Sequence, residues 1–290
     1  MAGGFAIDII EIPSDRFTCE LSADAAPAIE VPPGSVLRIH CRSAADRVVG
    51  PGPIRADRAN PATGPIAVAD AAVGQALKVQ VLAIEPESPG HLSAGWDGGM
   101  QAVEISDGRV DFHGLRIPLR PMIGVLGVAP PSGSWSTMDC GPYGGNMDTN
   151  DVAPGATVYL PVFQPGGLLV LGDCHAVMGD GEIGGQGLEV AATVTLRVGV
   201  EPEPISRHVH LVRDGRLMVI GCAERIADAV KAAAVEMMAI IERTGRLDEF
   251  NAMKLLGLAG ETLFGQHCCP IRSVRVSLPL EHLPGLLPQV

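Results

Sequence analysis

The chain has 290 residues, of which 47% are hydrophobic and 19% charged, so it can bury a sizeable core and is not a disordered protein. Its formal net charge of −12 argues against nucleic acid and anionic membrane surfaces as partners, because like charges repel. No apolar run reaches the roughly 18 residues that a membrane-spanning helix needs.

The N-terminal segment and the cysteines indicate in which cellular compartment the protein is expected. The first ten residues lack the basic flank of a signal peptide and already contain Asp8, so we expect no secretory leader. The seven cysteines are odd in number, scattered along the chain and never spaced as C-x-x-C. We therefore expect free thiols in a reducing cytoplasm, without a disulfide framework.

Residues 1–220 contain many short apolar runs separated by glycine and proline turns. The runs that read as strands are Ser35–Ile39, Leu77–Ile84, Val103–Ile105, Arg109–Phe112, Thr157–Phe163, Leu168–Leu171, Val190–Val200 and His208–Val212. Asp107-Gly108 lies between two of these runs and predicts a tight hairpin. This spacing predicts a mainly β fold, with a β-sandwich or barrel-like core and Gly/Pro-rich turns.

The pattern changes after residue 220. Helical spacing predicts a first helix, ended at Thr244-Gly245, whose apolar positions are Ile226, Val230, Ala234, Met237 and Ile241. A shorter helix over Asp248–Leu258 and a final strand over Ser273–Leu280 follow. We predict that residues 221–290 form a smaller α+β portion, packed closely on the β-rich core of residues 1–220 that carries the site motifs.

Two glycine-rich segments concentrate chemically active side chains. Gly144–Asp148 reads GGNMD, and Gly172–Glu182 reads GDCHAVMGDGE. Acids and imidazole are expensive to bury without a partner, and glycines let the backbone approach whatever these groups hold. The combination favours a metal-assisted catalytic site.

Three residues of these motifs are candidate metal ligands. If the segment that contains them is strand-like, alternation sends Asp173 and His175 to the same face. With Asp148 they could hold a hard or borderline cation and leave coordination open for water or substrate, as a catalytic metal site requires. The alternative is that Asp148 and Asp173 only cap glycine-rich turns.

Three further residues are candidate catalytic groups. Amide hydrolysis needs a base for the attacking water and an acid for the leaving nitrogen, and one carboxylate can perform both tasks. We assign this role to Glu182 ahead of Asp180, although both could form a solvated acidic turn. Asn146 could hold the amide carbonyl or stabilise the oxyanion, or it could pin the turn at Gly144-Gly145.

Cysteine chemistry offers a rival mechanism. Some amidases attack through a thiolate, and Cys174 lies beside the key histidine, but strand alternation points it to the opposite face, where a buried thiol acts as a small hydrophobe. No G-x-S-x-G elbow supports a serine nucleophile. The segment His267-Cys268-Cys269 lacks partners at metal-ligand spacing, and its purpose stays open.

Several segments, taken in order, resemble the acetamidase/formamidase family from about Val31 to about Pro279. They are Thr63–Ile66, Pro121–Pro130, Gly144–Asp148, Gly155–Phe163 and Gly172–Glu182. The resemblance implies hydrolysis of a short linear amide, such as formamide or acetamide, to ammonia and a carboxylate. It also implies a mainly β architecture, a homo-oligomer and a divalent metal, for which we expect zinc ahead of calcium.

Two positions depart from the family pattern. Members often carry an acid where this chain has Ser43, and many carry His or Asn where it has Tyr143. These departures keep two alternatives open. The chain could be a non-catalytic or repurposed relative that binds a small ligand, or it could hydrolyse another C–N or ester bond.

Overall fold

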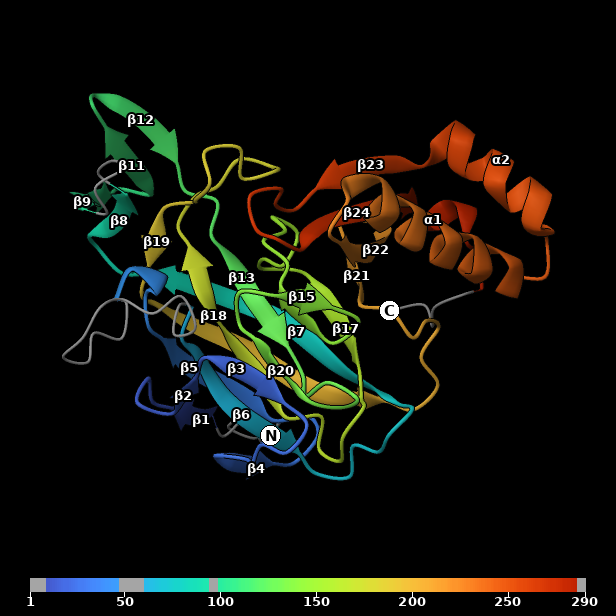
Figure 1. The fold of residues 1–290 in the computed structure, drawn as a ribbon, viewed down its shortest axis with the longest axis horizontal. Coiled ribbons are helices and arrows are strands. Elements are labelled where there is room, and N and C mark those ends of the chain that lie inside the picture. The colour runs from blue at the N-terminus through green and yellow to red at the C-terminus, as the bar shows by residue number, and fades with distance from the viewer. Residues whose placement is uncertain (1–8, 47–59, 94–98, 286–290) are drawn as a thin grey trace, which may run out of the picture.

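The computed structural model describes residues 9–46, 60–93 and 99–285 (Figure 1). The first eight residues of the segment expected to lack a leader lie outside this range. Strands in several sheets make up most of the regular structure. The predicted fold class, mainly β with two helices near the C-terminus, is confirmed. Within the described residues, no helix is both long and apolar enough to cross a membrane.

A nine-stranded sheet runs from the N-terminal region to the C-terminal region of the chain. In spatial order its strands are β1 (Ile9–Ile12), β5 (Val36–Cys41), β20 (Ala192–Glu201), β7 (Ala76–Pro86), β17 (Thr157–Pro161), β21 (His210–Arg213), β22 (Arg216–Ala223), β24 (Arg272–Pro279) and β23 (Glu261–Phe264). β22 crosses residue 220, where we placed the end of the core, and pairs with strands on both sides of it. The division at residue 220 stays a prediction.

A ten-stranded sheet carries the glycine-rich motifs. Its main path is β15 (Cys140–Gly141), β16 (Gly144–Asn146), β13 (Met122–Gly127), β18 (Leu169–His175), β19 (Glu189–Val190), β8 (Gly90–Ser93) and β9 (Met100–Val103). The remaining strands, β2 (Phe17–Thr18), β4 (Ile29–Val31) and β6 (Ala62–Val68), branch from β18 through β6. Fully buried aliphatic side chains from both large sheets form one hydrophobic core.

Two small sheets complete the β structure. β3 (Glu20–Ser22) pairs with β14 (Ser134–Ser136). β10 (Ile105–Ser106), β11 (Arg109–Phe112) and β12 (Leu115–Pro118) form an antiparallel hairpin sheet. The turn between β10 and β11 is Asp107-Gly108, and both residues have positive φ, at 50° and 67°. Such a two-residue turn fits the twist of the flanking strands, so the predicted tight hairpin is present.

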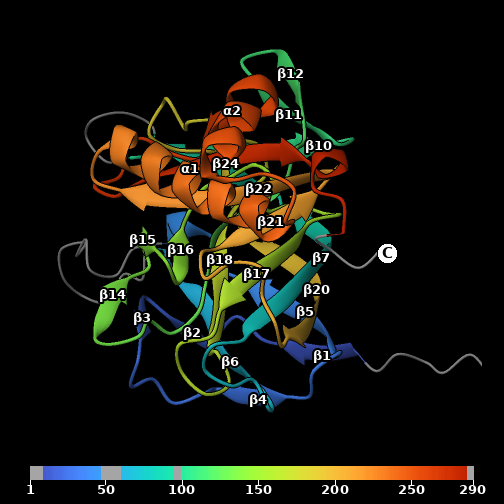
Figure 2. The ribbon, with the colours of Figure 1, turned by 90° about the vertical axis from the view of Figure 1, so that its right-hand side faces the viewer.

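The two helices lie together on the C-terminal end of the nine-stranded sheet (Figure 2). α1 (Ile226–Arg243) packs on β22 and β24, and α2 (Glu249–Ala259) packs on α1. A Cβ on Gly221 would lie 2.0 Å from Ala229 O, so glycine is what lets α1 approach β22 this closely. The fully buried face of α1 includes Ala229, Ala233 and Met237. It is therefore rotated slightly around the helix from the apolar positions predicted from the sequence. Short 3-10 helices lie at Ala44–Asp46 and Leu280–His282.

Candidate active site

Three adjacent strands of the ten-stranded sheet bring the two glycine-rich motifs together. Asn146 ends β16, Asp148 follows two residues later, and Asp173 and His175 lie at the end of β18. β13 lies between these strands and pairs with both. The structure therefore places the predicted metal ligands from two separated motifs in one cluster.

Gly124 of β13 makes room for the carboxylates. Its carbonyl oxygen accepts hydrogen bonds from the backbone N–H groups of Met147 and Asp148, at 3.0 and 3.2 Å. A Cβ on Gly124 would lie 2.4 Å from Asp148 Oδ1 and 2.6 Å from Asp173 O. Any larger residue would push these groups out of position, so the glycine is a structural requirement of the cluster.

The backbone at the site is unusual. Asp148, Asp173 and Glu182 have φ values of 42°, 54° and 48°, and Asn60 has a φ of 52°. These lie in the left-handed region, which Asn and Asp tolerate better than Glu. Strained backbone concentrates at functional sites, where the surrounding structure holds it in place. The backbone of β18 is therefore irregular at Asp173, yet His175 Nε2 still lies 3.8 Å from Asp173 Oδ1.

Two overlapping sets of side chains could each hold a metal ion. Asp148, Asp173 and His175 are all buried, and each offers a ligand atom within 4.8 Å of the others. His175 also belongs to a second set with Glu182 and Glu189. The side-chain atoms Asp148 Oδ1 and His175 Nδ1 are buried without a hydrogen-bond partner. Buried polar atoms are rarely left unpaired, so such atoms point to an additional binding partner.

Two residues of this cluster, Glu189 and Asn60, were not predicted from the sequence. Glu189 Oε1 lies 3.0 Å from His175 Nε2, because β19 pairs with the end of β18. Asn60 Nδ2 donates to Asp173 Oδ2 at 2.7 Å and to Asn146 Oδ1 at 3.3 Å. Glu189 follows the second motif by only seven residues, so a wider search for acids would have found it. Nothing in the local sequence marks Asn60, which depends on contacts across the fold.

Burial and mutual repulsion shift the protonation of the cluster. Burial raises the pKa of Asp148 and of Asp173 well above the usual carboxyl range, and the charges of Glu182 and Glu189 raise both further. Burial also raises the pKa of Glu182. Burial alone would lower the pKa of His175, but the nearby carboxylates, Glu189 first, outweigh it and raise that pKa.

The cluster has an excess of acids. Its four carboxyl groups are those of Asp148, Asp173, Glu182 and Glu189. Across the described ranges, His175 is the only side chain that forms an ion pair with any of them. The four carboxyl groups, once ionised, therefore carry more negative charge than neighbouring residues can balance. A buried charge of this kind is stable only when it is paired, protonated or bound to a cation.

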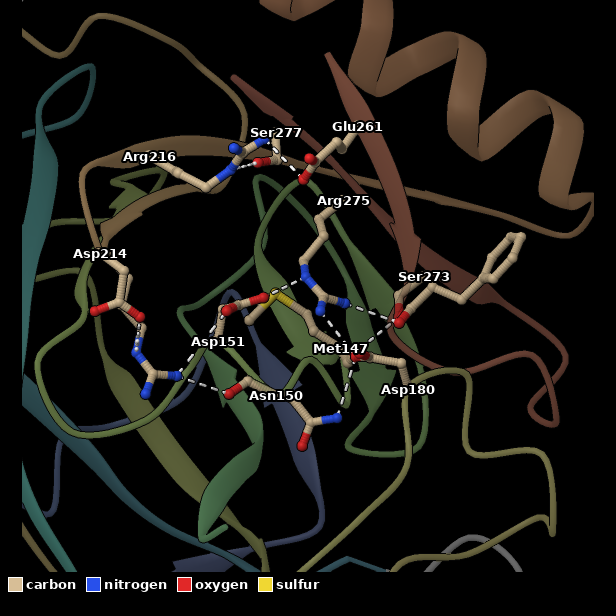
Figure 3. Close-up of polar contacts among 12 residues, drawn as sticks. Met147, Asn150, Asp151, Asp180, Asp214, Arg216, Glu261, Ser273, Arg275 and Ser277 are labelled. Carbon is tan, nitrogen blue, oxygen red and sulfur yellow. Dashed lines mark hydrogen bonds and ion pairs between the residues drawn. The ribbon is translucent and has the colours of Figure 1, made fainter. Parts of the chain in front are cut away.

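A buried arginine fixes the loops beside the cluster (Figure 3). Arg275 of β24 forms ion pairs with Asp151 and, at 2.8 Å, with Asp180, and it donates to Phe264 O at 2.8 Å. Asn150 Nδ2 donates to Asp180 at 3.1 Å. Burial would raise the pKa of Asp180, but these donors outweigh it and lower that pKa. A carboxylate held ionised by an arginine is a poor proton donor, so the contacts favour a structural role for Asp180.

The segment between β23 and β24 covers the other side of the site. Cys268 Sγ donates to Glu182 Oε2 at 3.1 Å, and Asn146 Nδ2 donates to Cys269 Sγ at 3.5 Å. A hydrogen bond with Cys269, then burial and then Glu182 raise the pKa of Cys268, so the thiol stays protonated. The unexplained His267-Cys268-Cys269 segment thus contacts two of the predicted catalytic residues.

Three further residues singled out from the sequence have contacts of their own. Cys174 is buried in the hydrophobic core together with Cys41, whose strand belongs to the other large sheet, so it faces away from the carboxylates as predicted. Tyr143 stacks on Trp135 with ring centroids 6.1 Å apart. Ser43 is buried, and its hydroxyl accepts from Ala45 N at 3.1 Å. These contacts account for all three residues without a catalytic role.

Comparison with known proteins connects this geometry to a family. The model of the Acetamidase/Formamidase family matches residues 134–211, a range that includes both glycine-rich motifs. An acetamidase from Bacillus halodurans is 33% identical, with a TM-score of 0.89, over 96% of this chain and 99% of that chain. A predicted acetamidase/formamidase from Thermoanaerobacter tengcongensis is 35% identical, with a TM-score of 0.88, over 95% of this chain and 98% of that chain.

The matches to curated proteins are shorter. A formamidase from Methylophilus methylotrophus is 36% identical over 67 residues, which are 23% of this chain and 16% of that protein. The alignment therefore spans about a sixth of the curated relative. The two solved structures named above, by contrast, match over nearly their whole length at more than 30% identity. The chain belongs to the acetamidase/formamidase family of amidohydrolases.

Proposed function

We propose that the chain hydrolyses short linear amides, such as formamide and acetamide, to ammonia and a carboxylate, with the assistance of a divalent cation. One observation carries the proposal. Asp148, Asp173 and His175 converge in a buried cluster whose acids outnumber the available positive groups. Family membership supports the amide bond as the target, and this cluster supports a cation as the assistant.

The residues fit a divalent cation well. Two carboxylates and one imidazole form the type of donor set found at catalytic zinc sites, where coordination stays open for water or substrate. Asp148 Oδ1 has no hydrogen-bond partner, and Gly124 keeps the space beside it clear. We place zinc ahead of calcium, because an imidazole nitrogen suits zinc better than calcium. When bound, the cation would polarise the amide carbonyl and lower the pKa of water.

Glu182 is the residue that we propose to move protons. Its pKa is raised by burial, which brings the carboxyl group closer to the pH at which it can both accept and donate a proton. It would take a proton from the attacking water and give one to the leaving nitrogen. Both Gly187 N–H and Cys268 Sγ donate to its carboxylate, so the group is held in a defined orientation.

Asn146 is the residue that we propose to orient the amide. Asn60 donates to its side-chain oxygen, and this fixes which end of the carboxamide presents its N–H groups. One of these N–H groups faces Cys269. The carboxamide has two such donors, so the second can bind the substrate carbonyl or the oxyanion that develops from it.

The test is ammonia release from formamide, acetamide and a series of longer amides, with and without a chelator. Elemental analysis of the same purified protein identifies the metal. We expect turnover of short amides that is lost with the chelator and restored by zinc. Chelator-insensitive turnover would remove the metal from the proposal. If no amide is hydrolysed although the metal is retained, the ligand-binding alternative is favoured. Activity on a panel of esters and cyclic amides would reveal another target bond.

We also propose that the chain forms a homo-oligomer, as the family resemblance implies. Apolar side chains on the outer face of α2 support it, because Phe250, Met253 and Leu258 are all exposed. Exposed apolar groups that gather on one element are typical of interaction surfaces. Light scattering on the purified protein should give a mass of at least twice 30.1 kDa. A monomeric mass would reject this proposal.

A further inference from the structure

The segment between β23 and β24 is anchored directly to the loop that carries Glu182. Gly181 N donates to Gly265 O at 3.0 Å, and His267 N donates to Gly181 O at 3.2 Å. His267 Nδ1 also lies 2.7 Å from Gly181 O. These bonds place residues 265–269 alongside Gly181. The loop with Gly181 follows β18 of the ten-stranded sheet, whereas residues 265–269 join β23 to β24 of the nine-stranded sheet (Figure 1).

A fully buried glutamine gives this segment a fixed shape. Gln266 Oε1 accepts from Cys269 N at 3.0 Å, and Gln266 Nε2 donates to Ile271 O at 2.7 Å. Its backbone N–H donates to Ser273 Oγ at 3.0 Å. The Gln266 side chain thus binds the backbone of Cys269 and of Ile271, and this fixes the loop that carries both thiols.

Each thiol contacts a different residue to which we assign a role in the reaction. Cys268 donates to Glu182 at 3.1 Å, and Cys269 accepts from Asn146 at 3.5 Å. The thiols also contact each other. This arrangement fixes the carboxylate that moves protons and the carboxamide that orients the amide. A cysteine that served only as a core hydrophobe would have no reason to contact either group.

We propose that Cys268 and Cys269 are positioning residues for amide hydrolysis: Cys268 holds the carboxylate of Glu182, and Cys269 holds the carboxamide of Asn146. This inference rests on the proposed function. Precise placement of reacting groups contributes strongly to rate, and small displacements are costly. Cys268 therefore acts on turnover through Glu182, whereas Cys269 acts on substrate binding through Asn146.

The first experiment compares Cys268→Ala with Cys268→Ser, because serine keeps a donor and alanine does not. We expect Cys268→Ala to lower kcat about ten-fold with KM unchanged, as for the loss of one charge-assisted hydrogen bond. Cys268→Ser should recover most of this loss, and metal content should match the wild type in both variants. Cys19→Ser, on the loop between β2 and β3, is the control and should leave kcat and KM unchanged.

Cys269→Ala should produce the opposite pattern. We expect KM to rise about three-fold with a smaller effect on kcat, because the variant loosens Asn146 and leaves Glu182 in place. Wild-type kinetics in both alanine variants would overturn the inference while leaving the proposed function intact. An inactive Cys268→Ser variant would overturn it too, since it would indicate that the sulfur itself reacts with the substrate.

A second measurement needs no substrate. The rate at which N-ethylmaleimide alkylates Cys268 is followed by mass spectrometry in the wild type and in Glu182→Ala. Because the carboxylate keeps the proton on the sulfur and the thiolate is the nucleophile, we expect roughly five-fold faster alkylation in the variant, with Cys19 unchanged. An equal rate would show that Glu182 does not hold Cys268, and would overturn the inference. Absence of wild-type amide hydrolysis, by contrast, rejects the proposed function itself.

Discussion

The two sides of the candidate site differ in chemistry and in construction. The core side, from β18, β19 and the loops that follow β16 and β18, supplies four acids and an imidazole, and three of the acids have left-handed backbone. The C-terminal side, from the segment between β23 and β24, supplies two thiols and is partly exposed; the pKa of one of them, Cys268, is raised. The core side holds buried charged groups in place, which is energetically costly. The segment between β23 and β24 only orients two of the core-side groups, Glu182 and Asn146. We therefore expect substitutions on the core side to cause severe losses of turnover or metal binding, and substitutions on the C-terminal side to cause smaller, graded losses of turnover.

The largest effect is expected at His175, which belongs to both ligand sets. His175→Ala should abolish metal binding and reduce kcat by at least about a thousand-fold, because it removes a proposed ligand from a site that needs three. The measurements are metal content by elemental analysis and ammonia release. If the variant keeps both its metal and its turnover, the metal site does not lie on the core side.

Glu182→Gln should separate proton transfer from metal binding. We expect metal content to stay at the wild-type level, while turnover falls by about 10²–10⁴-fold, the usual contribution of a general acid or base. The variant keeps the shape of the side chain, so folding should be preserved and can be checked by circular dichroism. Normal turnover would remove Glu182 from the mechanism and would also weaken the role assigned to Cys268.

Gly124→Ala tests whether the carboxylates need the space beside β13. The added Cβ would lie 2.4 Å from Asp148 Oδ1, so metal affinity should fall by about 10–100-fold, as for other disturbances of ligand orientation. Gly199→Ala on β20 is the matched control, because no atom lies within 4 Å of its added Cβ. Equal metal affinity in both variants, measured by competition with a chelating dye, would contradict the requirement.

Arg275→Met tests the link between the two sides. The variant leaves Asp151 and Asp180 without their buried partner, so the free energy of unfolding should fall by about 2–4 kcal/mol in urea denaturation. Arg225→Met is the control, because Arg225 pairs with Asp228 on the surface, and it should change stability by less than about 0.5 kcal/mol. Similar losses in both variants would show that the buried network does not support the fold.

The same network makes a prediction about pH. The pKa of Asp180 is lowered, so its contribution to stability is complete above the ordinary carboxyl pKa and is lost as the pH falls through the lowered value. Arg275→Met should therefore flatten this part of the stability profile between about pH 5 and pH 2. An unchanged profile would indicate that Arg275 does not hold Asp180.

The smallest effect is expected at Cys174, which lies beside His175 but faces Cys41. Cys174→Ala should keep most of the activity and cost about 1 kcal/mol of stability, since a small buried side chain is shortened. This contrasts with Cys268, whose thiol contacts Glu182. An inactive Cys174→Ala variant with normal metal content would restore the thiolate mechanism.

The sequence predicted the parts of the fold that depend on neighbouring residues. Both helices, and strands such as β7, β17 and β20, lie close to where periodicity and turn residues placed them. Alternation also placed Cys174 opposite His175, despite the irregular backbone at Asp173. Strands without a clean period were missed, such as the seven-residue β6, which contains Gly64-Pro65, because proline and glycine there resemble a turn.

The sequence by itself determined the mainly β class, the two helices, the family motifs and most of the acids that converge. Only the tertiary structure decided which distant residues join them. Asn60 lies 113 residues from Asp173, and Cys268 lies 86 residues from Glu182. Local patterns report backbone preference and which side chains face the core, whereas contacts at such separations depend on strand order and loop placement. That is why His267-Cys268-Cys269 had no evident purpose until the fold placed its cysteines against Glu182 and Asn146.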